Sequence, residues 1–264
     1  MQKCINQRPL SRGNQNRSMI RLNYNQSEVS FENRVETNKQ NDGHPFFSST
    51  PGQCSLFKLC QEYVLSLGWE KCFFAPQHDR CYCNNCYSSS QPDVILTAGD
   101  TYVVPREWAG FGLSVDPALA DYHKLWTEWI VTYHGTSIYA AQSILANRQF
   151  LIPGDVLLNG SVLGIRPGHI PGKKHIYTSP SIRYSSLDVY SIRNDFTASS
   201  GKKYKAQLVL QCRQKPGTFK IQPETVGRGQ DPICDFISND KIEYFTEIRV
   251  SLVPYRLLVN LKDI

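Results

Sequence analysis

The stretch WIVTYHGTSIYAAQSILAN, residues 129–147, places a strand directly in front of a helix. Trp129–His134 alternates like a half-buried strand. Ser137 is a favoured cap for a helix that continues through about Asn147. That helix turns one apolar face inward, formed by Ile138, Ala141 and Leu145. The tripeptide His-Gly-Thr at 134–136 therefore lies at the end of a strand, just before a helix begins.

Further strands and one long loop follow this unit. Residues 153–175 hold eight glycines and prolines, and loops of this length inside a compact domain tend to be lids or binding loops. Tyr204–Cys212 alternates and predicts a strand, and Ile242–Val253 predicts another. The expected apolar face of the later strand consists of Tyr244, Ile248, Val250 and Leu252. This mixture of helices and strands predicts an α+β fold.

Three short segments carry side chains that suit one site. His134-Gly135-Thr136 ends the first strand, the run HIYTS at 175–179 contains Tyr177, and Glu243 lies in the late strand. Tyr177 follows His134 by 43 residues, and Glu243 follows Tyr177 by 66. In this order and at these spacings, the segments resemble the diphtheria-toxin-like ADP-ribosyltransferases, which include the catalytic domains of poly(ADP-ribose) polymerases. The resemblance covers about residues 128–264.

The resemblance implies an ADP-ribosyltransferase fold, in which two small sheets face each other across a cleft for NAD. It also implies a role for each part of the motif. His134 would bond a ribose hydroxyl group on the adenosine side, and the backbone of Gly135 would hold the nicotinamide carboxamide. Thr136 would also belong to the NAD-binding residues. Tyr177 would pack against the nicotinamide ribose and ring, under a loop, residues 153–175, that covers NAD.

Two of the implied NAD contacts have more than one candidate. Tyr190 is the expected second stacking tyrosine, but its offset from Tyr177 is slightly long, so Tyr184 remains an alternative. Either Ser185 or Ser186 would bond the carboxamide. These choices all fall within one short segment, so the sequence places the contacts there without separating them.

Glu243 is the expected catalytic carboxylate, together with His134 and Tyr177. Cleavage of the bond between nicotinamide and ribose passes through an oxocarbenium-like cation, which a nearby negative charge stabilises. Glu247 competes for this role four residues further on, and Glu243 is preferred because it precedes Tyr244 in the Glu-Tyr pattern. Two histidines that flank the loop, His169 and His175, are expected to be solvated.

The implied activity is mono-ADP-ribosyl transfer from NAD to a macromolecular acceptor, with release of nicotinamide. The acceptor, a protein or a nucleic acid, stays open. The alternative is a catalytically silent module that binds NAD, ADP-ribose or a protein partner. Silent copies usually lose the late glutamate, and this chain keeps Glu243. An RNA 2′-phosphotransferase, a related NAD-using fold, fits less well for the same reason.

A cysteine cluster precedes this region and predicts a structural zinc site. The chain has nine cysteines, and the run CFFAPQHDRCYCNNC at 72–86 holds four of them. Zinc takes four tetrahedral nitrogen or sulfur ligands, and short spacings let one loop wrap the ion. The expected ligands are Cys72, Cys81, Cys83 and Cys86, with His78 as the alternative to Cys72. Cys60 lies on the apolar stripe of a helix and is expected in the core, and Cys54 is left undecided.

The region from this cluster to the C-terminus also resembles the C-terminal region of neuralized-like proteins. In those proteins a cysteine-rich segment precedes a similar His-Gly-Thr unit. The likeness rests on Cys-Tyr-Cys-x-x-Cys at 81–86, Tyr-His-Gly-Thr-Ser at 133–137 and Ser-Pro-Ser-Ile-Arg-Tyr at 179–184. It keeps open a role as a ubiquitin-linked adaptor.

The expected domains are a disordered polar tail at 1–50, a helical zinc-binding segment at 51–127 and the transferase domain at 128–264. The tail is rich in Asn, Gln, Ser and Arg, and it has too few apolar residues to offset the entropy of ordering. In the second segment, an apolar stripe predicts a helix from about Ser55 to a stop at Gly68. Asp116-Pro117 predicts the start of a second helix, with Leu119, Tyr122, Leu125 and Trp126 on one side.

Composition and charge point to an intracellular protein of the cytoplasm or nucleus. No run of 18 apolar residues is present, so no membrane span is expected, and the N-terminal residues lack the apolar core of a secretory signal. An odd number of clustered cysteines fits metal binding in a reducing compartment better than a disulfide framework. The net charge of +6 over 264 residues does not by itself argue for nucleic acid.

Overall fold

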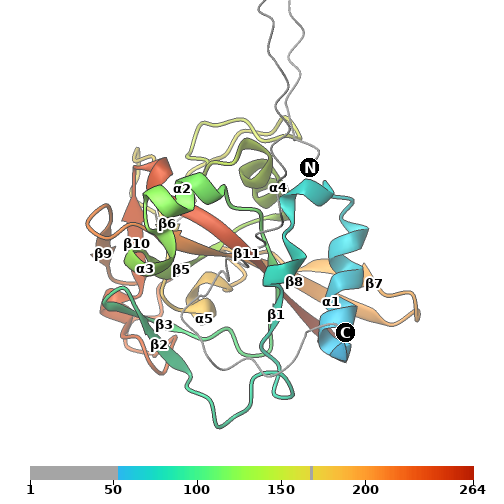
Figure 1. The fold of residues 1–264 in the computed structure, drawn as a ribbon. Helices are drawn as coiled ribbons and strands as arrows, with labels where there is room; N and C mark the ends of the chain where they lie inside the picture. The colour runs from blue at the N-terminus through green and yellow to red at the C-terminus, as the bar shows by residue number, and fades with distance from the viewer. Residues whose placement is uncertain (1–52, 167–168) are drawn as a thin grey trace, which may run out of the picture. The chain divides into compact units, whose positions relative to one another are not determined.

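A computed structural model of the chain describes residues 53–166 and 169–264. The expected tail at 1–50 lies outside the described residues. These described residues fall in one compact unit with α+β architecture, as predicted, and their strands form three antiparallel sheets (Figure 1). Within the described ranges, no helix combines the length and apolarity needed to cross a bilayer.

The largest sheet has six strands and runs through the middle of the unit (Figure 1). Its two long strands, β8 and β11, pair over almost their whole length, with a register shift between Pro254 and Arg256. β7 pairs with the outer part of β8. The strand bounds are β1 (Arg80–Cys81), β4 (Ala109–Gly112), β11 (Leu252–Asp263), β8 (Lys203–Gln214), β5 (Ile130–Gly135) and β7 (Asn194–Thr197).

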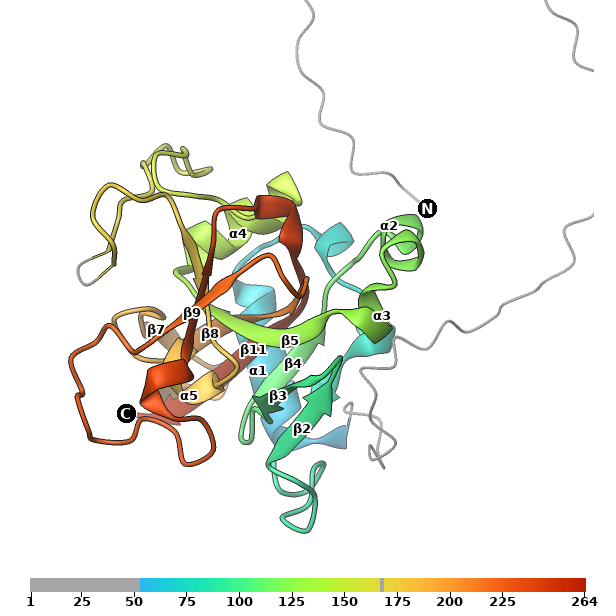
Figure 2. The same cartoon turned by 90° about the vertical axis from the view of Figure 1, so that its left-hand side faces the viewer.

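Two smaller sheets accompany it (Figure 2). One consists of β6 (Ile176–Thr178), β10 (Glu243–Thr246) and β9 (Lys220–Gln222), in that order. The other is the hairpin of β2 (Val94–Thr97) and β3 (Asp100–Val103). Backbone hydrogen bonds between Tyr133 and Ser179 join β5 of the large sheet to the chain just after β6. The large and the three-stranded sheet therefore meet where His134 and Tyr177 lie.

Other parts of the chain cover both faces of the large sheet. Because successive side chains of a strand point to opposite faces, each long strand contributes residues to two cores. On one face, Leu208, Leu210 and Leu257 pack in a core with residues of α1 (Ser55–Ser66) and α4 (Ile138–Asn147). On the other face, Val209 and Leu258 pack with aromatic residues from the chain around β1 to β5 and with α5 (Ile182–Ser185). This double coverage explains why β8 is buried over most of its length.

Two helices, α1 and α4, begin and end where the sequence predicts. α1 begins at Ser55, buries Phe57, Cys60, Tyr63 and Val64, and is followed by Gly68 at a φ of +65°. The prediction that Cys60 lies in the core is confirmed, since its side chain is fully buried. α4 begins after Ser137, whose hydroxyl group accepts a hydrogen bond from the backbone N–H of Ala140.

The helix expected after Asp116-Pro117 is split in two. Asp116 caps α2 (Pro117–Tyr122), but Lys124 adopts a left-handed backbone with a φ of +48° before α3 (Leu125–Glu128). Such a residue ends one helix and reorients the next. The four residues expected on one apolar helix face therefore do not form a common face. Leu119 and Tyr122 are exposed, whereas Leu125 is buried.

The strand expected at Ile242–Val253 is also wrong as a single element. β10 ends at Thr246, a short 3₁₀ turn (Arg249–Ser251) follows, and β11 begins at Leu252 in a different sheet. The Thr246 hydroxyl group accepts a hydrogen bond from the N–H of Ile248, and Ser251 donates to the carbonyl of Ile248. Such local bonds compete with a strand ladder, and they leave Ile248 and Val250 exposed.

The segment at 51–127, expected to be helical, contributes four strands to the described fold. β1 and β4 from this segment join the large sheet, where β4 pairs with β11. α1 packs against the same two strands, β4 and β11. The large sheet therefore crosses the boundary that was expected at 127/128.

Candidate functional site

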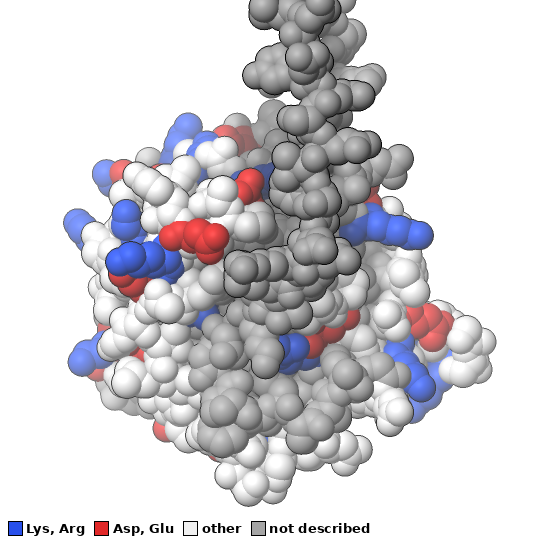
Figure 3. Space-filling view, in the orientation of Figure 1, with Lys and Arg blue, Asp and Glu red and all other residues white. Residues whose placement is uncertain are grey.

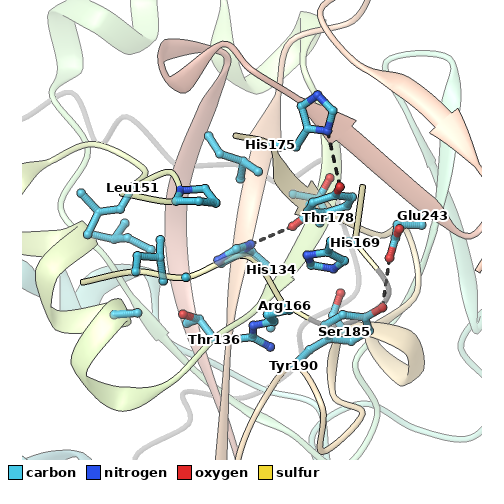
Figure 4. A pocket seen from close by; sticks show the side chains of 18 of the residues that line it. His134, Thr136, Leu151, Arg166, His169, His175, Thr178, Ser185, Tyr190 and Glu243 are labelled. Carbon is cyan, nitrogen blue, oxygen red and sulfur yellow. Dashed lines mark hydrogen bonds between the residues drawn. The ribbon is translucent and has the colours of Figure 1, made fainter. Parts of the chain in front are cut away.

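A pocket lies where β5, β6 and β10 approach α4, α5 and the loop that follows α4 (Figure 4). It brings together residues from all three predicted segments, although these segments are 43 and more residues apart in the sequence. The predicted site residues that line it are His134, Gly135, Thr136, Tyr177, Tyr184, Ser185, Tyr190 and Glu243.

His134 enters the pocket from the end of β5, and its hydrogen bond determines which ring nitrogen carries the proton. Its Nδ1 lies 2.8 Å from the backbone carbonyl oxygen of Tyr177 (Figure 4). A carbonyl oxygen only accepts, so Nδ1 donates and the other ring nitrogen, Nε2, keeps a free lone pair. Burial lowers the pKa of His134 to about 4, although the hydrogen bond to Tyr177 acts in the opposite direction. The imidazole is therefore neutral at pH 7 and offers Nε2 as an acceptor.

Gly135 lies where two pieces of backbone meet. A Cβ atom at this position would lie 2.0 Å from the carbonyl oxygen of Ser185 and 2.8 Å from the Cβ of Tyr190. Non-bonded atoms do not approach this closely, so only glycine lets the end of β5 touch the last residue of α5 and the chain that follows it. The Ser185 hydroxyl group donates to the carbonyl of Tyr133 at 3.0 Å, which holds the same contact from the other side.

Tyr177 connects the pocket to the loop and to a second histidine. Its hydroxyl group accepts a hydrogen bond from the N–H of Ile170 at 3.3 Å and lies 3.4 Å from Nδ1 of His175. The other nitrogen of His175 lies 3.0 Å from a carboxylate oxygen of Glu247. The expectation that His175 is solvated is wrong, because the loop and β10 enclose it and only 8% of it is exposed.

Glu243 is the most densely hydrogen-bonded side chain of the pocket, with 1% of its surface exposed. Its Oε2 accepts from the hydroxyl groups of Tyr184 at 2.6 Å and Tyr190 at 3.0 Å. Its Oε1 accepts from the amide of Gln222 at 2.5 Å, and Thr225 lies 3.1 and 3.2 Å from the two oxygens. The backbone explains part of this arrangement, since Glu243 and Gln222 face each other across β10 and β9.

The two candidate stacking tyrosines share the carboxylate but differ in orientation. Their hydroxyl groups lie 2.8 Å apart, and burial together with the charge of Glu243 raises the pKa of both Tyr184 and Tyr190. Both phenols therefore stay protonated and donate to Glu243. The ring of Tyr190 is nearly parallel to the imidazole of His169, with centroids 5.9 Å apart. This orientation makes Tyr190 the tyrosine that presents a stacking face to the pocket.

The sequence missed several residues of this site. Arg166 and His169 line the pocket from the loop. The expectation that His169 is solvated is wrong, because its ring stacks on Tyr177 and its Nε2 atom is buried. Gln222 and Thr225 reach Glu243 from β9 and the chain that follows it. No local motif marks these residues, because their role depends on which strand lies beside β10.

A second candidate site is a group of four cysteines beside α1. The thiols of Cys54, Cys81, Cys83 and Cys86 all lie within 4.8 Å of one another, and such a group could hold a metal ion. Cys54 Sγ is 3.5 Å from the Sγ atoms of both Cys81 and Cys83. Three of the four expected ligands are therefore in place, together with Cys54.

The expected fourth ligand, Cys72, is not in this group, and neither is its alternative His78. The Sγ of Cys72 lies 3.4 Å from a carboxylate oxygen of Glu70. Cys54 takes the fourth position because it directly precedes α1, and α1 packs against β4, the strand that pairs with β1 and Cys81. Tertiary packing thus brings in a candidate ligand 27 residues before Cys81.

Comparison with known proteins adds no family to these observations. No protein-family model matches the chain, and no curated protein matches it.

Proposed function

We propose that the protein is a mono-ADP-ribosyltransferase that takes ADP-ribose from NAD. The observation that carries the proposal is the convergence of His134, Tyr177, Tyr190 and Glu243 on one pocket. The sequence resemblance implies NAD-binding or catalytic roles for these residue types, and separate elements bring them together. The resemblance also implies the ADP-ribosyltransferase fold, and the meeting of the large and the three-stranded sheet at the pocket supports it.

In this proposal, NAD binds through groups whose hydrogen-bonding capacity is open. The Nε2 lone pair of His134 accepts a ribose hydroxyl hydrogen. The Ser185 hydroxyl group donates to a backbone carbonyl, so its oxygen can accept from the carboxamide N–H groups of nicotinamide. The nicotinamide ring lies against the faces of Tyr177 and Tyr190. These contacts orient the bond between nicotinamide and ribose toward Glu243.

Glu243 supplies negative charge close to the ribose as positive charge develops there. Its hydrogen bonds from Tyr184, Tyr190, Gln222 and Thr225 hold the carboxylate in one position before the substrate arrives. A charge held in advance in a water-poor pocket stabilises an oxocarbenium-like transition state without reorganisation. The bond between ribose and nicotinamide breaks, and its electron pair leaves on neutral nicotinamide. The acceptor nucleophile forms the new bond to the ribose and releases its proton to the solvent.

The proposed acceptor is a macromolecule, either a protein or a nucleic acid. On the face shown in Figure 3, basic and acidic side chains are interspersed, and neither sign dominates among the described residues. The experiment incubates the protein with NAD labelled in its adenylate part and with a cell lysate. Label that enters macromolecules and becomes soluble on protease treatment identifies a protein acceptor, and nuclease sensitivity identifies a nucleic acid. No transfer to any acceptor and no release of nicotinamide would contradict the proposal.

We propose further that the four-cysteine group binds one structural zinc ion. In a tetrahedral zinc–thiolate site with bonds of about 2.3 Å, sulfur atoms are about 3.8 Å apart. The observed 3.5 Å contacts of Cys54, and a span below 4.8 Å for the whole group, match that size. Four cysteine ligands leave no open position, so the ion would stabilise the junction of α1 and β1 rather than take part in catalysis.

A second candidate function is favoured by one observation, the saturation of Glu243. Its carboxylate already contacts four donors, so a ribose hydroxyl group has to displace one of them. A buried carboxylate in this position could serve to hold β9, β10 and the tyrosines together in a catalytically silent module that binds NAD or ADP-ribose, an adaptor of the neuralized-like type. NAD binding without nicotinamide release would identify this alternative.

A further inference from the structure

The imidazole of His169 lines the pocket beside Tyr177 and Tyr190. It stacks on the ring of Tyr177 with a centroid distance of 3.7 Å and an interplanar angle of 19°. It is also nearly parallel to the ring of Tyr190, at 5.9 Å and 15°. Figure 4 shows His169 in the same region as His134, Tyr190 and Glu243. A flat aromatic ring thus already lies against both tyrosine faces.

Neighbouring loop residues hold the imidazole in this position. The N–H of Ile170 donates to the hydroxyl group of Tyr177 at 3.3 Å. Arg166 donates to the carbonyl of Val189 at 2.6 Å, and its guanidinium group lies 5.9 Å from the centroid of the Tyr190 ring. The contacts reach both tyrosine segments, so the stacking of His169 is part of a docked arrangement that includes Arg166 and Ile170.

The docked arrangement leaves one polar atom unsatisfied. The Nε2 of His169 is buried and has no hydrogen-bond partner among the described residues. A buried, unpaired ring nitrogen costs free energy, whereas a solvated imidazole bonds to water. His169 therefore fills the space well as a flat ring but poorly as a polar group. A flat ring that carries its own hydrogen-bonding group would fit the same space better.

We propose that His169 is a built-in competitor for the nicotinamide ring of NAD. This inference rests on the proposed function. The slot formed by Tyr177 and Tyr190 takes a planar heteroaromatic ring, and in the free protein that ring is the imidazole of His169. A ligand binds only when the imidazole has left, so its apparent affinity is reduced by the fraction of molecules in which the slot is open.

The test measures the binding of nicotinamide alone and of NAD, by calorimetry, to the full chain and its variants. His169→Ala empties the slot and is expected to tighten nicotinamide binding by about fivefold or more. His169→Phe keeps a flat ring without the unpaired nitrogen, and it is expected to weaken binding below that of wild type. Lys173→Ala, an exposed position of the same loop, is the matched control and leaves the affinity unchanged.

The outcomes separate this inference from the proposed function, because binding and transfer are measured separately for each variant. Equal nicotinamide affinity for wild type, His169→Ala and His169→Phe would overturn the competitor and leave the proposed transferase standing. Tighter binding to His169→Ala without transfer by any variant would support the competitor and overturn the proposed activity. If neither nicotinamide nor NAD binds any variant, both proposals are wrong.

Discussion

The Nδ1 atom of His134 lies 2.8 Å from the backbone carbonyl oxygen of Tyr177 and thereby ties the end of β5 to β6. The contact joins two residues that are 43 positions apart in the sequence and selects the tautomer in which Nε2 is the acceptor. A residue that the sequence marks for ligand binding therefore also connects two sheets. Replacement of His134 should therefore change both ligand affinity and protein stability.

We expect His134→Ala to weaken NAD binding by about tenfold, which is the effect of one lost hydrogen bond of about 1 kcal/mol together with lost contact area. Because the contact to Tyr177 is lost as well, the melting temperature should fall modestly. His134→Asn can still donate to the carbonyl of Tyr177 and should recover stability more than affinity. Calorimetric titration with NAD and thermal melts of the three proteins check this, and unchanged affinity in His134→Ala would contradict the cleft assignment.

Glu243→Gln should keep NAD affinity within a few fold and lower transfer and nicotinamide release by about 10²–10³, because the carboxylate acts mainly on the charged transition state. The measurement is the rate of nicotinamide release with saturating NAD. Glu247 is not a neutral control, since it contacts His175 beside Tyr177. The better control is Glu128→Gln, an exposed carboxylate paired with Lys124, which should keep full activity. Equal rates for Glu243→Gln and wild type would exclude a catalytic Glu243.

Gly135→Ala should destabilise the protein and distort the pocket, because the new methyl group would lie 2.0 Å from the Ser185 carbonyl oxygen. Overpacking of this kind costs about 1–3 kcal/mol. Gly164→Ala is the control, since a Cβ there meets no atom within 4 Å. Denaturant unfolding of both variants checks the difference. Equal free energies of unfolding would mean that the backbone contact at Gly135 is not as close as described.

Purified protein should contain about one zinc ion per chain, and Cys54→Ser should lower that content while Cys72→Ser leaves it unchanged. The reason is that Cys54, and not Cys72, belongs to the four-thiol group. Metal analysis of the soluble fraction gives the result, and native thiol alkylation shows whether the remaining cysteines become accessible. Loss of zinc in Cys72→Ser with retention in Cys54→Ser would reverse the ligand assignment.

Nicotinamide affinity of the wild type should rise as the pH falls from 7 to 5. Burial lowers the pKa of stacked His169 to about 4, with the charges of Arg166 and His175 acting in the same direction. A solvated imidazole has a pKa of about 6.5, so between these values the unstacked state binds more protons and falling pH favours it. The gain ends once the slot is open in nearly all molecules, so it approaches but does not exceed the factor by which His169→Ala tightens binding at pH 7.

The control for this pH profile is His169→Ala. The charged and titratable groups that face the imidazole are His134, Arg166, His175, Tyr177, Tyr190 and Glu243. Protonation of His134 would weaken binding in both proteins, so the ratio of the two affinities isolates His169. The ratio should approach one as the pH falls, and a ratio that does not change between pH 7 and 5 would contradict the expected titration.

Several elements were predictable from the sequence because local interactions determine them. The caps at Ser137 and Asp116 and the stop at Gly68 act within one turn of a helix, and each lies where the sequence indicates. The order of His134, Tyr177 and Glu243 also predicted a shared site, and the pocket brings the three together. Helix periodicity and capping depend on neighbours a few residues away, so they can be interpreted without the fold.

Other features depend on contacts between distant segments. Cys54 joins the cysteine group because α1 packs against the large sheet, and Thr225 reaches Glu243 because β9 pairs with β10. The expected strand at Ile242–Val253 is divided because its two halves pair with different partners. His169 was expected in solvent, but it stacks on Tyr177 within the pocket. The sequence and the short-range interactions within it determine the helix ends and the order of the site residues. Which distant segments pair and pack together depends on the tertiary structure, because pairing and packing energies arise only between segments that the fold has brought together.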